Sequence, residues 1–239
     1  MKESTQMDLS QNTIQQAVDI VMEGRRSIRA FLDKPVLRSE IEDILHISAR
    51  APSGTNTQPW KVYVVMGNKK VELGQKILHA FLDPQASQKY HPEYAYYPSE
   101  WVNPFLARRR KVGFDLYALL GLGKEDKLGM QAQHGRNFTF FDAPVGIFFT
   151  INKVMGLGSW LDYGMFLQNV MLAARARGLD TCAQAAFTQF HQIIRQDLGI
   201  PDDEQLICGM SLGYEDRSKI ENTLVTEREP VSNFASFIE

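Results

Sequence analysis

Cysteine and histidine are scarce in this sequence, and their spacing excludes several kinds of site. The chain has 239 residues but only two cysteines, Cys182 and Cys208. Two cysteines cannot form a disulfide framework or a four-thiolate metal site. Both lie in apolar surroundings, so we expect buried and unreactive thiols. No two of the five histidines stand three to five residues apart. The sequence therefore offers no local zinc pair, and we expect no bound metal.

Long apolar runs and a strong charge excess are also missing. The formal net charge is −2, and hydrophobic residues make up 44% of the chain. No apolar run approaches the length that crosses a bilayer, and residues 1–10 lack the apolar core of a signal peptide. We therefore expect a cytoplasmic protein that binds neither membranes nor nucleic acid.

The sequence contains none of three common catalytic motifs. There is no GxxxxGK[ST] phosphate loop, no GxGxxG dinucleotide fingerprint and no GxSxG elbow. A Ser-His-Asp arrangement assembled by the fold stays open. Any site must therefore be sought in less familiar patterns.

Periodicity predicts helices and strands in irregular alternation. We expect helices over residues 13–23, from 39 to just before 52, and over 160–178 and 188–199, with Ser39 and Glu42 forming a capping box and Thr188 capping the last helix. We expect strands over residues 60–66, followed by a Gly67-Asn68 turn, and over 144–151 and 206–212, with the end of a strand and a turn over 181–187. Strict βαβ alternation and a linker are both absent. The pattern predicts one α+β domain over residues 1–239.

Residues 75–133, here called the aromatic excursion, interrupt this pattern. Periodicity is poor before about residue 105, and helix follows. The segment is either a lid over a site or a satellite cluster under a long loop. Its aromatic side chains include Tyr90, Tyr94, Tyr96, Tyr97, Trp101, Phe105, Phe114 and Tyr117.

The helix that begins near Trp160 is apolar on nearly every side. Such a helix must be buried, either at the domain centre or against a second subunit. The last stretch, residues 226–239, is polar and aromatic without a period. We interpret it as an arm that packs on another surface.

Two polar segments have the composition of a ligand site. In Arg25-Arg26-Ser27-Ile28-Arg29 the arginine forks match phosphate geometry and the serine adds a hydroxyl. The alternative is a solvated basic helix end that complements the helix dipole. The second segment, residues 51–60, reads Ala-Pro-Ser-Gly-Thr-Asn-Thr-Gln-Pro-Trp. It is a rigid turn in which Gly54 permits close approach and Gln58 offers an amide, or else an ordinary connecting loop.

In this order, about twenty-five residues apart, the two segments strongly resemble the FMN-dependent nitroreductase family. The C-terminal half agrees with this resemblance, which covers about residues 17–237. Within the family, the nitrobenzoate-reductase-like members are the most similar. The agreement is carried by Asp142-Ala143-Pro144, by Cys182-Ala183-Gln184-Ala185-Ala186-Phe187, by residues 207–214 and by Glu227-Arg228-Glu229-Pro230.

The resemblance implies an α+β fold with a central, mainly antiparallel sheet flanked by helices, in an intertwined homodimer with two FMN sites at the interface. It implies that the backbone N–H near Ala185 faces flavin N5, although some relatives have Glu-Gly where this sequence has Ala185-Ala186. The remaining cofactor-binding residues follow by role: Arg25, Arg26, Ser27 and Arg228 at the phosphate and ribityl chain, Arg29 and Asn137 at the pyrimidine, Gln184 beside Ala185, and Pro52, Ser53, Gly54 and Gln58 in the loop from the other subunit.

The implied activity is transfer of hydride from NAD(P)H through flavin N5 to a small nitroaromatic acceptor in a ping-pong mechanism. This chemistry needs no side-chain acid or base, so we assign no catalytic residue. Two alternatives remain open. The same site can serve reduction of quinones, enones, free flavin or halogenated phenols, or the chain can bind flavin without turnover.

Overall fold

A four-stranded sheet forms the centre of the computed structural model, which describes residues 10–239. Every pair of neighbouring strands is antiparallel, so the predicted α+β class is confirmed. Nearly all residues of the two inner strands are buried, which fits their almost continuous apolar sequence. The strand order across the sheet is β1 (Trp60–Met66), β2 (Val145–Asn152), β4 (Glu204–Gly213) and β3 (Asp180–Gln184).

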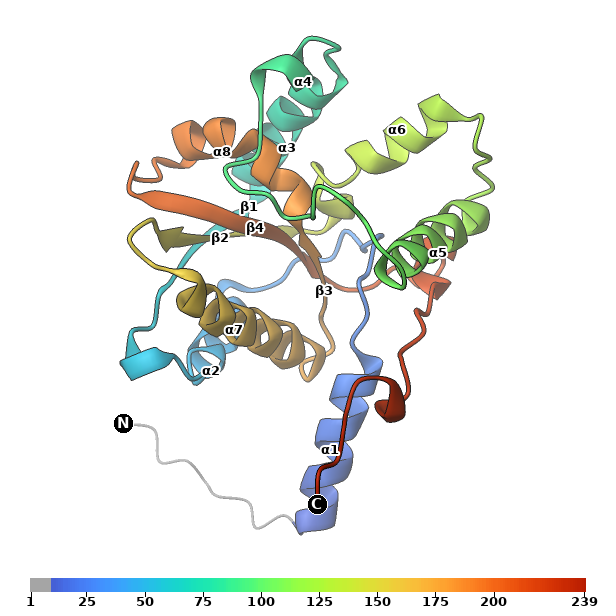
Figure 1. Ribbon diagram of the computed structural model, residues 1–239. Coiled ribbons are helices and arrows are strands. Elements are labelled where there is room, and N and C mark those ends of the chain that lie inside the picture. The colour runs from blue at the N-terminus through green and yellow to red at the C-terminus, as the bar shows by residue number, and fades with distance from the viewer. Residues whose placement is uncertain (1–9) are drawn as a thin grey trace.

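Helices cover both faces of the sheet (Figure 1). On one face, α2 (Arg38–Ser48) and α7 (Leu157–Arg175) enclose an apolar cluster. On the other face, α3 (Gly67–Leu82), α8 (His191–Leu198) and the short η3 (Ala185–Phe190) enclose a second cluster rich in phenylalanine. Within residues 10–239, no helix has the length and apolar character needed to cross a membrane.

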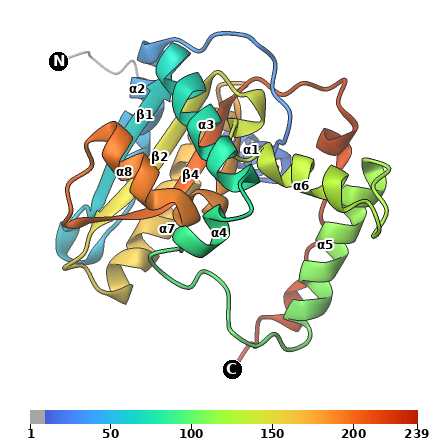
Figure 2. The same cartoon turned by 90° about the horizontal axis from the view of Figure 1, so that it is seen from above.

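Two terminal segments extend beyond these layers. Helix α1 (Gln11–Gly24) has no buried residue, and its apolar Ile20 is 69% exposed. The tail after β4 carries short helical turns η4 (Ile220–Thr223) and η5 (Val231–Asn233), and its Phe237 is 83% exposed. Figure 2 shows this tail projecting from the body together with helices of the aromatic excursion. Both segments therefore present apolar side chains that this chain does not cover.

The aromatic excursion contains α4 (Ala86–Lys89), α5 (Phe105–Leu119) and α6 (Lys127–Gly135). Its predicted start at residue 75 is wrong, because α3 runs on to Leu82. Gly67 and Asn68 do not form the predicted turn but open this helix, and Leu73 and Ile77 are fully buried against the sheet. The Gly-Asn signal therefore marked the end of a strand but not the start of a loop.

Both predicted N-terminal caps are wrong. Helix α2 begins at Arg38, after Leu37, whose backbone N–H donates to Glu40 Oε2 at 2.8 Å. The predicted capping carboxylate of Glu42 instead pairs with Arg38 at 2.7 Å. The Thr188 hydroxyl lies inside η3, where it donates to the Ala185 carbonyl, and α8 begins three residues later. In each case the predicted capping residue has a different hydrogen-bond or ion-pair partner: Arg38 for Glu42 and the Ala185 carbonyl for Thr188.

Two glycine stops are confirmed. Gly178, with φ of +75°, follows α7, and Gly199, with φ of +64°, follows α8. Left-handed backbone at such positions favours glycine. The start of α7 is three residues earlier than predicted, at Leu157, where Gly156 supplies an extended N-cap.

Candidate functional site

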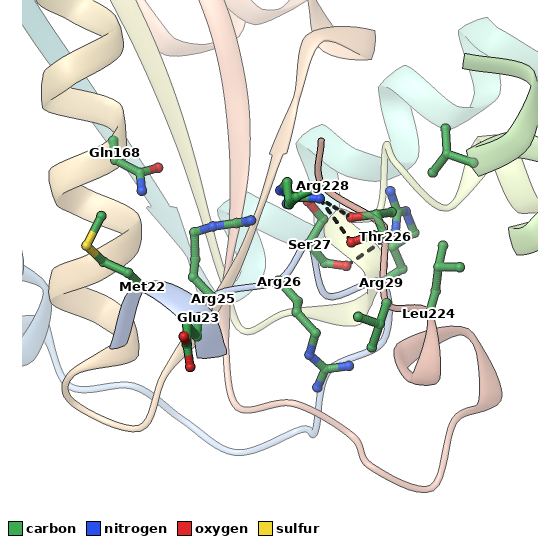
Figure 3. Close-up of a pocket in the computed structure, with 12 residues that line it drawn as sticks. Met22, Glu23, Arg25, Arg26, Ser27, Arg29, Gln168, Leu224, Thr226 and Arg228 are labelled. Carbon is green, nitrogen blue, oxygen red and sulfur yellow. Dashed lines mark hydrogen bonds between the residues drawn. The ribbon is translucent and has the colours of Figure 1, made fainter. Parts of the chain in front are cut away.

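The basic segment after α1 is an extended strap, here called the arginine strap (residues 25–29). Arg25 has extended backbone, with φ of −70° and ψ of 122°. Ile28 is buried, and its N–H donates to the Thr181 carbonyl at 3.0 Å, which fixes the strap against β3. Side chains of an extended chain point alternately to opposite sides. Arg25, Ser27 and Arg29 accordingly share one side, and the Arg26 side chain points to the other (Figure 3).

A cavity of about 820 Å³ opens on the first side of the strap. Arg25 and Arg228 face each other across it, and Glu23 points away from both (Figure 3). Burial lowers the pKa of Arg25, and the positive charge of Arg228 lowers it further. Other residues on its walls include Ser27, Arg29, Gln168 and Thr226.

This cavity holds cations without a matching carboxylate. Among the ion pairs within residues 10–239, none involves Arg25, Arg29 or Arg228. Arg228 Nη1 donates to the Thr226 hydroxyl at 2.7 Å and to the Glu227 carbonyl at 2.9 Å, which hold the charge in place without neutralising it. Arginines clustered in this way form a site for an anion such as phosphate.

Arg26 has a different environment from its neighbours. Its guanidinium pairs with Glu215 at 2.8 Å and also donates to the Asn222 carbonyl. The Glu215 side chain is only 7% exposed, so this pair ties the strap to the segment that follows β4. Of the residues predicted at the phosphate, Arg26 is the one whose charge is already paired with a carboxylate of the protein.

Asn222, which sequence reasoning missed, clamps the strap from the same segment. Its Oδ1 accepts from the Arg29 backbone N–H at 2.8 Å, and its Nδ2 donates to the carbonyls of Ala30 and Asp216 at 2.8 and 2.9 Å. The residue is 4% exposed. Nothing in the sequence around it differs from an ordinary polar turn, because its partners in the strap, Arg29 and Ala30, are nearly the whole chain length away.

A second cavity, of about 510 Å³ and here called the apolar cavity, lies at the end of β3. Ala185 opens η3, and the first N–H groups of a helical turn have no partner inside that turn. The Ala185 N–H is therefore placed to serve a group outside it. The aromatic excursion reaches this cavity, whose walls include Tyr94, Tyr96, Trp160, Gln184, Ala185 and Cys208.

The structure also brings Gln184 and Asn137 together beside this cavity. Gln184 is 3% exposed; its Nε2 donates to the Asn137 carbonyl at 2.7 Å, and its Oε1 accepts from the Ser211 hydroxyl at 2.6 Å. The Asn137 side chain donates to the His134 carbonyl at 2.9 Å. Gln184 thus fixes the backbone around Ala185 with a side chain that the protein fully employs.

The loop of residues 52–58 does not join these groups within one chain. Its Gly54 N–H donates to Asp162 Oδ2 at 3.1 Å, near the start of α7, whereas Gly24 packs on Arg175 at the end of that helix. At 1.5 Å per residue those two points are roughly 20 Å apart. The Ser53 hydroxyl accepts from the Gln58 N–H at 3.0 Å, which closes the loop on itself. The Pro52 side of the loop is exposed.

Neither cysteine has the surroundings of a reactive thiol. Cys182 and Cys208 are both free and buried. Burial raises the pKa of both, that of Cys208 to about 12. The structure thus confirms the expected buried thiols. Within residues 10–239, no group of three His, Cys, Asp or Glu side chains is arranged to hold a metal ion.

Comparison with known proteins places this arrangement in a family. The model of the nitroreductase family matches residues 22–214, which include the strap, the loop and the central sheet. The chain belongs to the nitroreductase family. The family predicted from the sequence is therefore confirmed, and the two cavities lie in a nitroreductase fold.

Three relatives show how close the match is. A 4-nitrobenzoate reductase of Pseudomonas putida is 40% identical over 92% of this nitroreductase chain and 95% of its own. A nitrobenzene nitroreductase of Ectopseudomonas oleovorans is 37% identical over 92% and 96%. The crystal structure of the FMN- and NADPH-dependent nitroreductase NfnB from sphigopyxis sp. strain HMH matches with a TM-score of 0.88 and 35% identity, over 93% of this chain and 99% of that one.

Proposed function

We propose that this protein is an FMN-dependent nitroreductase that takes hydride from NAD(P)H and reduces nitroaromatic acceptors. The observation that carries the proposal is the cluster of Arg25 and Arg228 beside Ser27, which lacks a carboxylate partner in a cavity of this family's fold. The relatives support the acceptor class, since their names specify nitrobenzoate and nitrobenzene. The related NfnB structure supports FMN and NADPH.

The residues present fit the cofactor. Arg25 and Arg228 would supply two cations for the phosphate, and the exposed Ser27 lines the same cavity. Arg29 is held through its backbone by Asn222, and within residues 10–239 its guanidinium donates only to the Ser27 carbonyl at 3.3 Å, so its charge can serve the pyrimidine end. When bound, FMN supplies the redox chemistry, accepting hydride from the nicotinamide and passing it to the acceptor. Arg26 supports the strap through Glu215 and contributes to the site by its backbone.

The chain's own residues orient and shield rather than donate protons. Gln184 and Asn137 fix the turn that presents the Ala185 N–H, and Tyr94 and Trp160 give that region an apolar wall. Donor and acceptor are both flat and aromatic, so one apolar slot suits each in turn. Alternating occupancy of one slot predicts ping-pong kinetics.

We further propose that the functional unit is a homodimer. Leu157 and Leu161 on α7 are 88% and 72% exposed, and α1 has no buried residue. Apolar surface of this extent marks an interface. Because residues 52–58 and the arginine strap lie near opposite ends of α7, packing two such helices antiparallel lets Pro52, Ser53, Gly54 and Gln58 of one subunit reach the arginine cavity of the other.

Anaerobic spectroscopy tests the proposed function. The purified protein, loaded with FMN, should bleach on addition of NADPH or NADH and regain its colour when nitrobenzene or 4-nitrobenzoate is added. Recovery with a quinone such as menadione, but with neither nitroarene, would favour the quinone-reductase alternative. Bound flavin that no nicotinamide bleaches would indicate a binding protein without turnover. Failure to bind FMN would contradict the proposal altogether.

A further inference from the structure

Residues 90–104 of the aromatic excursion form neither helix nor strand, yet one carboxylate anchors them to the core. The Glu93 side chain is 11% exposed. Its carboxylate accepts hydrogen bonds from Arg195 Nη2 of α8 at 2.9 Å and from the Leu206 N–H of β4 at 3.2 Å. It also forms an ion pair with Lys153, which follows β2, at 3.5 Å. His191 Nδ1 of α8 lies at 3.5 Å.

This anchoring is specific to the ionised carboxylate. Burial raises the pKa of Glu93, but the Leu206 N–H and the Arg195 guanidinium outweigh burial and hold the pKa below its ordinary value. The backbone is held at the same place, because Gln205 Nε2 approaches the Glu93 carbonyl at 3.4 Å. A buried charge with several donors holds a loop more firmly than an exposed ion pair does.

The residues next to Glu93 form the wall of the apolar cavity. The Tyr94 hydroxyl donates to the Ile207 carbonyl at 2.5 Å, and its ring meets Trp160 edge-on with centroids 4.7 Å apart. Tyr96 lines the same cavity and packs on Tyr97 with centroids 4.8 Å apart. Both tyrosines therefore depend on the backbone path that Glu93 fixes, and they line the apolar cavity together with Ala185.

We propose that Glu93 is a positioning residue for the electron acceptor. By holding residues 93–96 against β4 and α8, it places Tyr94 and Tyr96 beside Ala185 and so determines which aromatic acceptors are reduced well. This inference rests on the proposed function. In this inference the aromatic excursion covers the apolar cavity. Glu93 sets the position of the cover although its own side chain does not line the cavity.

Three variants test the inference, with a matched control. Glu93→Ala removes all the carboxylate contacts, and Glu93→Gln keeps an acceptor for the Leu206 N–H but loses the charge. Tyr94→Phe removes only the bond to the Ile207 carbonyl. The control is Asp197→Asn in α8, which weakens the ion pairs of a carboxylate away from the cavity, with Lys69 at 2.6 Å and Lys76 at 3.3 Å, on the side that faces α3.

Stopped-flow kinetics on the FMN-loaded variants separates the two half-reactions. In both Glu93 variants, flavin reduction by NADPH should stay within about twofold of the original, whereas reoxidation should show an acceptor KM raised about fivefold or more. The ratio of kcat/KM for nitrobenzene to that for 4-nitrobenzoate should change by about threefold or more. Tyr94→Phe should shift that ratio in the same direction, and Asp197→Asn should leave it unchanged.

The outcomes distinguish this inference from the function on which it rests. If the unaltered protein does not transfer electrons from NADPH to any acceptor, the proposed function fails. If it does, and Glu93→Gln retains the original acceptor ratio, Glu93 only stabilises the fold and the inference is overturned, whether or not Tyr94→Phe shifts the ratio. The conservative Glu93→Gln variant decides the question even where Glu93→Ala does not fold.

Discussion

Arg25 lies so close to Arg228 that the charge of the second lowers the pKa of the first. The two residues come from opposite ends of the chain, one after the first helix and the other from the last irregular segment. Two like charges held together without a carboxylate weaken the fold unless an anion joins them. A phosphate bound between Arg25 and Arg228 would therefore relieve this repulsion and stabilise the fold.

Removing either member of this pair should weaken FMN binding. We expect Arg25→Ala or Arg228→Ala to cost about 1.5–3 kcal/mol of binding energy, because each loses a charge-assisted bond to the phosphate. That corresponds to a rise in Kd of roughly 10- to 150-fold. Fluorescence titration of the FMN-free protein gives this value. Thermal unfolding without FMN should change little or improve, and an unchanged Kd would show that the cluster is merely a basic surface.

Arg26→Ala should behave differently from Arg25→Ala, although the two residues are adjacent. The substitution leaves the nearly buried Glu215 without its partner at 2.8 Å. We expect a loss of about 1–3 kcal/mol in the free energy of unfolding, discounted for the partial exposure of Arg26. Urea denaturation of the FMN-free proteins compares the two variants. Equal stability of both would contradict the assigned supporting role.

The sequence predicted where the arginine strap lies, but it did not predict the directions in which its side chains point. Residue type and order identified the strap and the family, but the alternation that separates Arg26 from Arg25 depends on Ile28 pairing with Thr181. The two inner strands, β2 and β4, were predicted to within two residues because burial on both faces makes them mostly apolar. The N-terminal caps of α2 and α8 were predicted wrongly, because the local hydrogen bonds of Leu37 and Thr188 determine where these helices begin and composition does not reveal them.

Residues that act across long separations could not be predicted at all. Asn222 and Glu93 each have partners more than a hundred residues away along the chain, in Arg29, Ala30, Arg195 and Leu206. A single asparagine or glutamate in an irregular stretch carries no periodic signal. The strap and the excursion are visible in the sequence, whereas the side chains that hold them depend on tertiary packing.

Glu93 should contribute to the pH dependence of stability. Its pKa in the folded protein lies below the ordinary value of 4.5, because the donors of Leu206 and Arg195 outweigh burial. The unfolded chain therefore binds the proton more readily, and folding stability rises with pH across this range. The stabilisation is present above pH 4.5 and is lost as the pH falls through the folded pKa.

Comparison with Glu93→Gln isolates this effect. Both proteins should also carry His191→Gln, because His191 and Lys153 face the carboxylate and the histidine titrates nearby. The difference in free energy of unfolding between the two should be greatest near neutral pH and should shrink as the pH falls from about 5.5 to 3.5. Chemical denaturation at several pH values measures it. A difference that stays constant over this range would show that the charge of Glu93 does not stabilise the fold.

A charge on the exposed face of α7 should separate the proposed dimer. Leu161 is 72% exposed in the single chain, and a glutamate there would be buried without a partner in an interface that packs two α7 helices. We expect Leu161→Glu to sediment as a monomer and to lose FMN, because the loop of residues 52–58 from the partner no longer reaches the arginine cavity.

The control is Val71→Glu, at a position 52% exposed on α3. This helix covers the opposite face of the sheet, so the substitution should leave the dimer intact. Analytical ultracentrifugation with detection at a flavin wavelength follows mass and cofactor together. A monomeric variant that keeps FMN as tightly as the original protein would show that each site is complete within one chain.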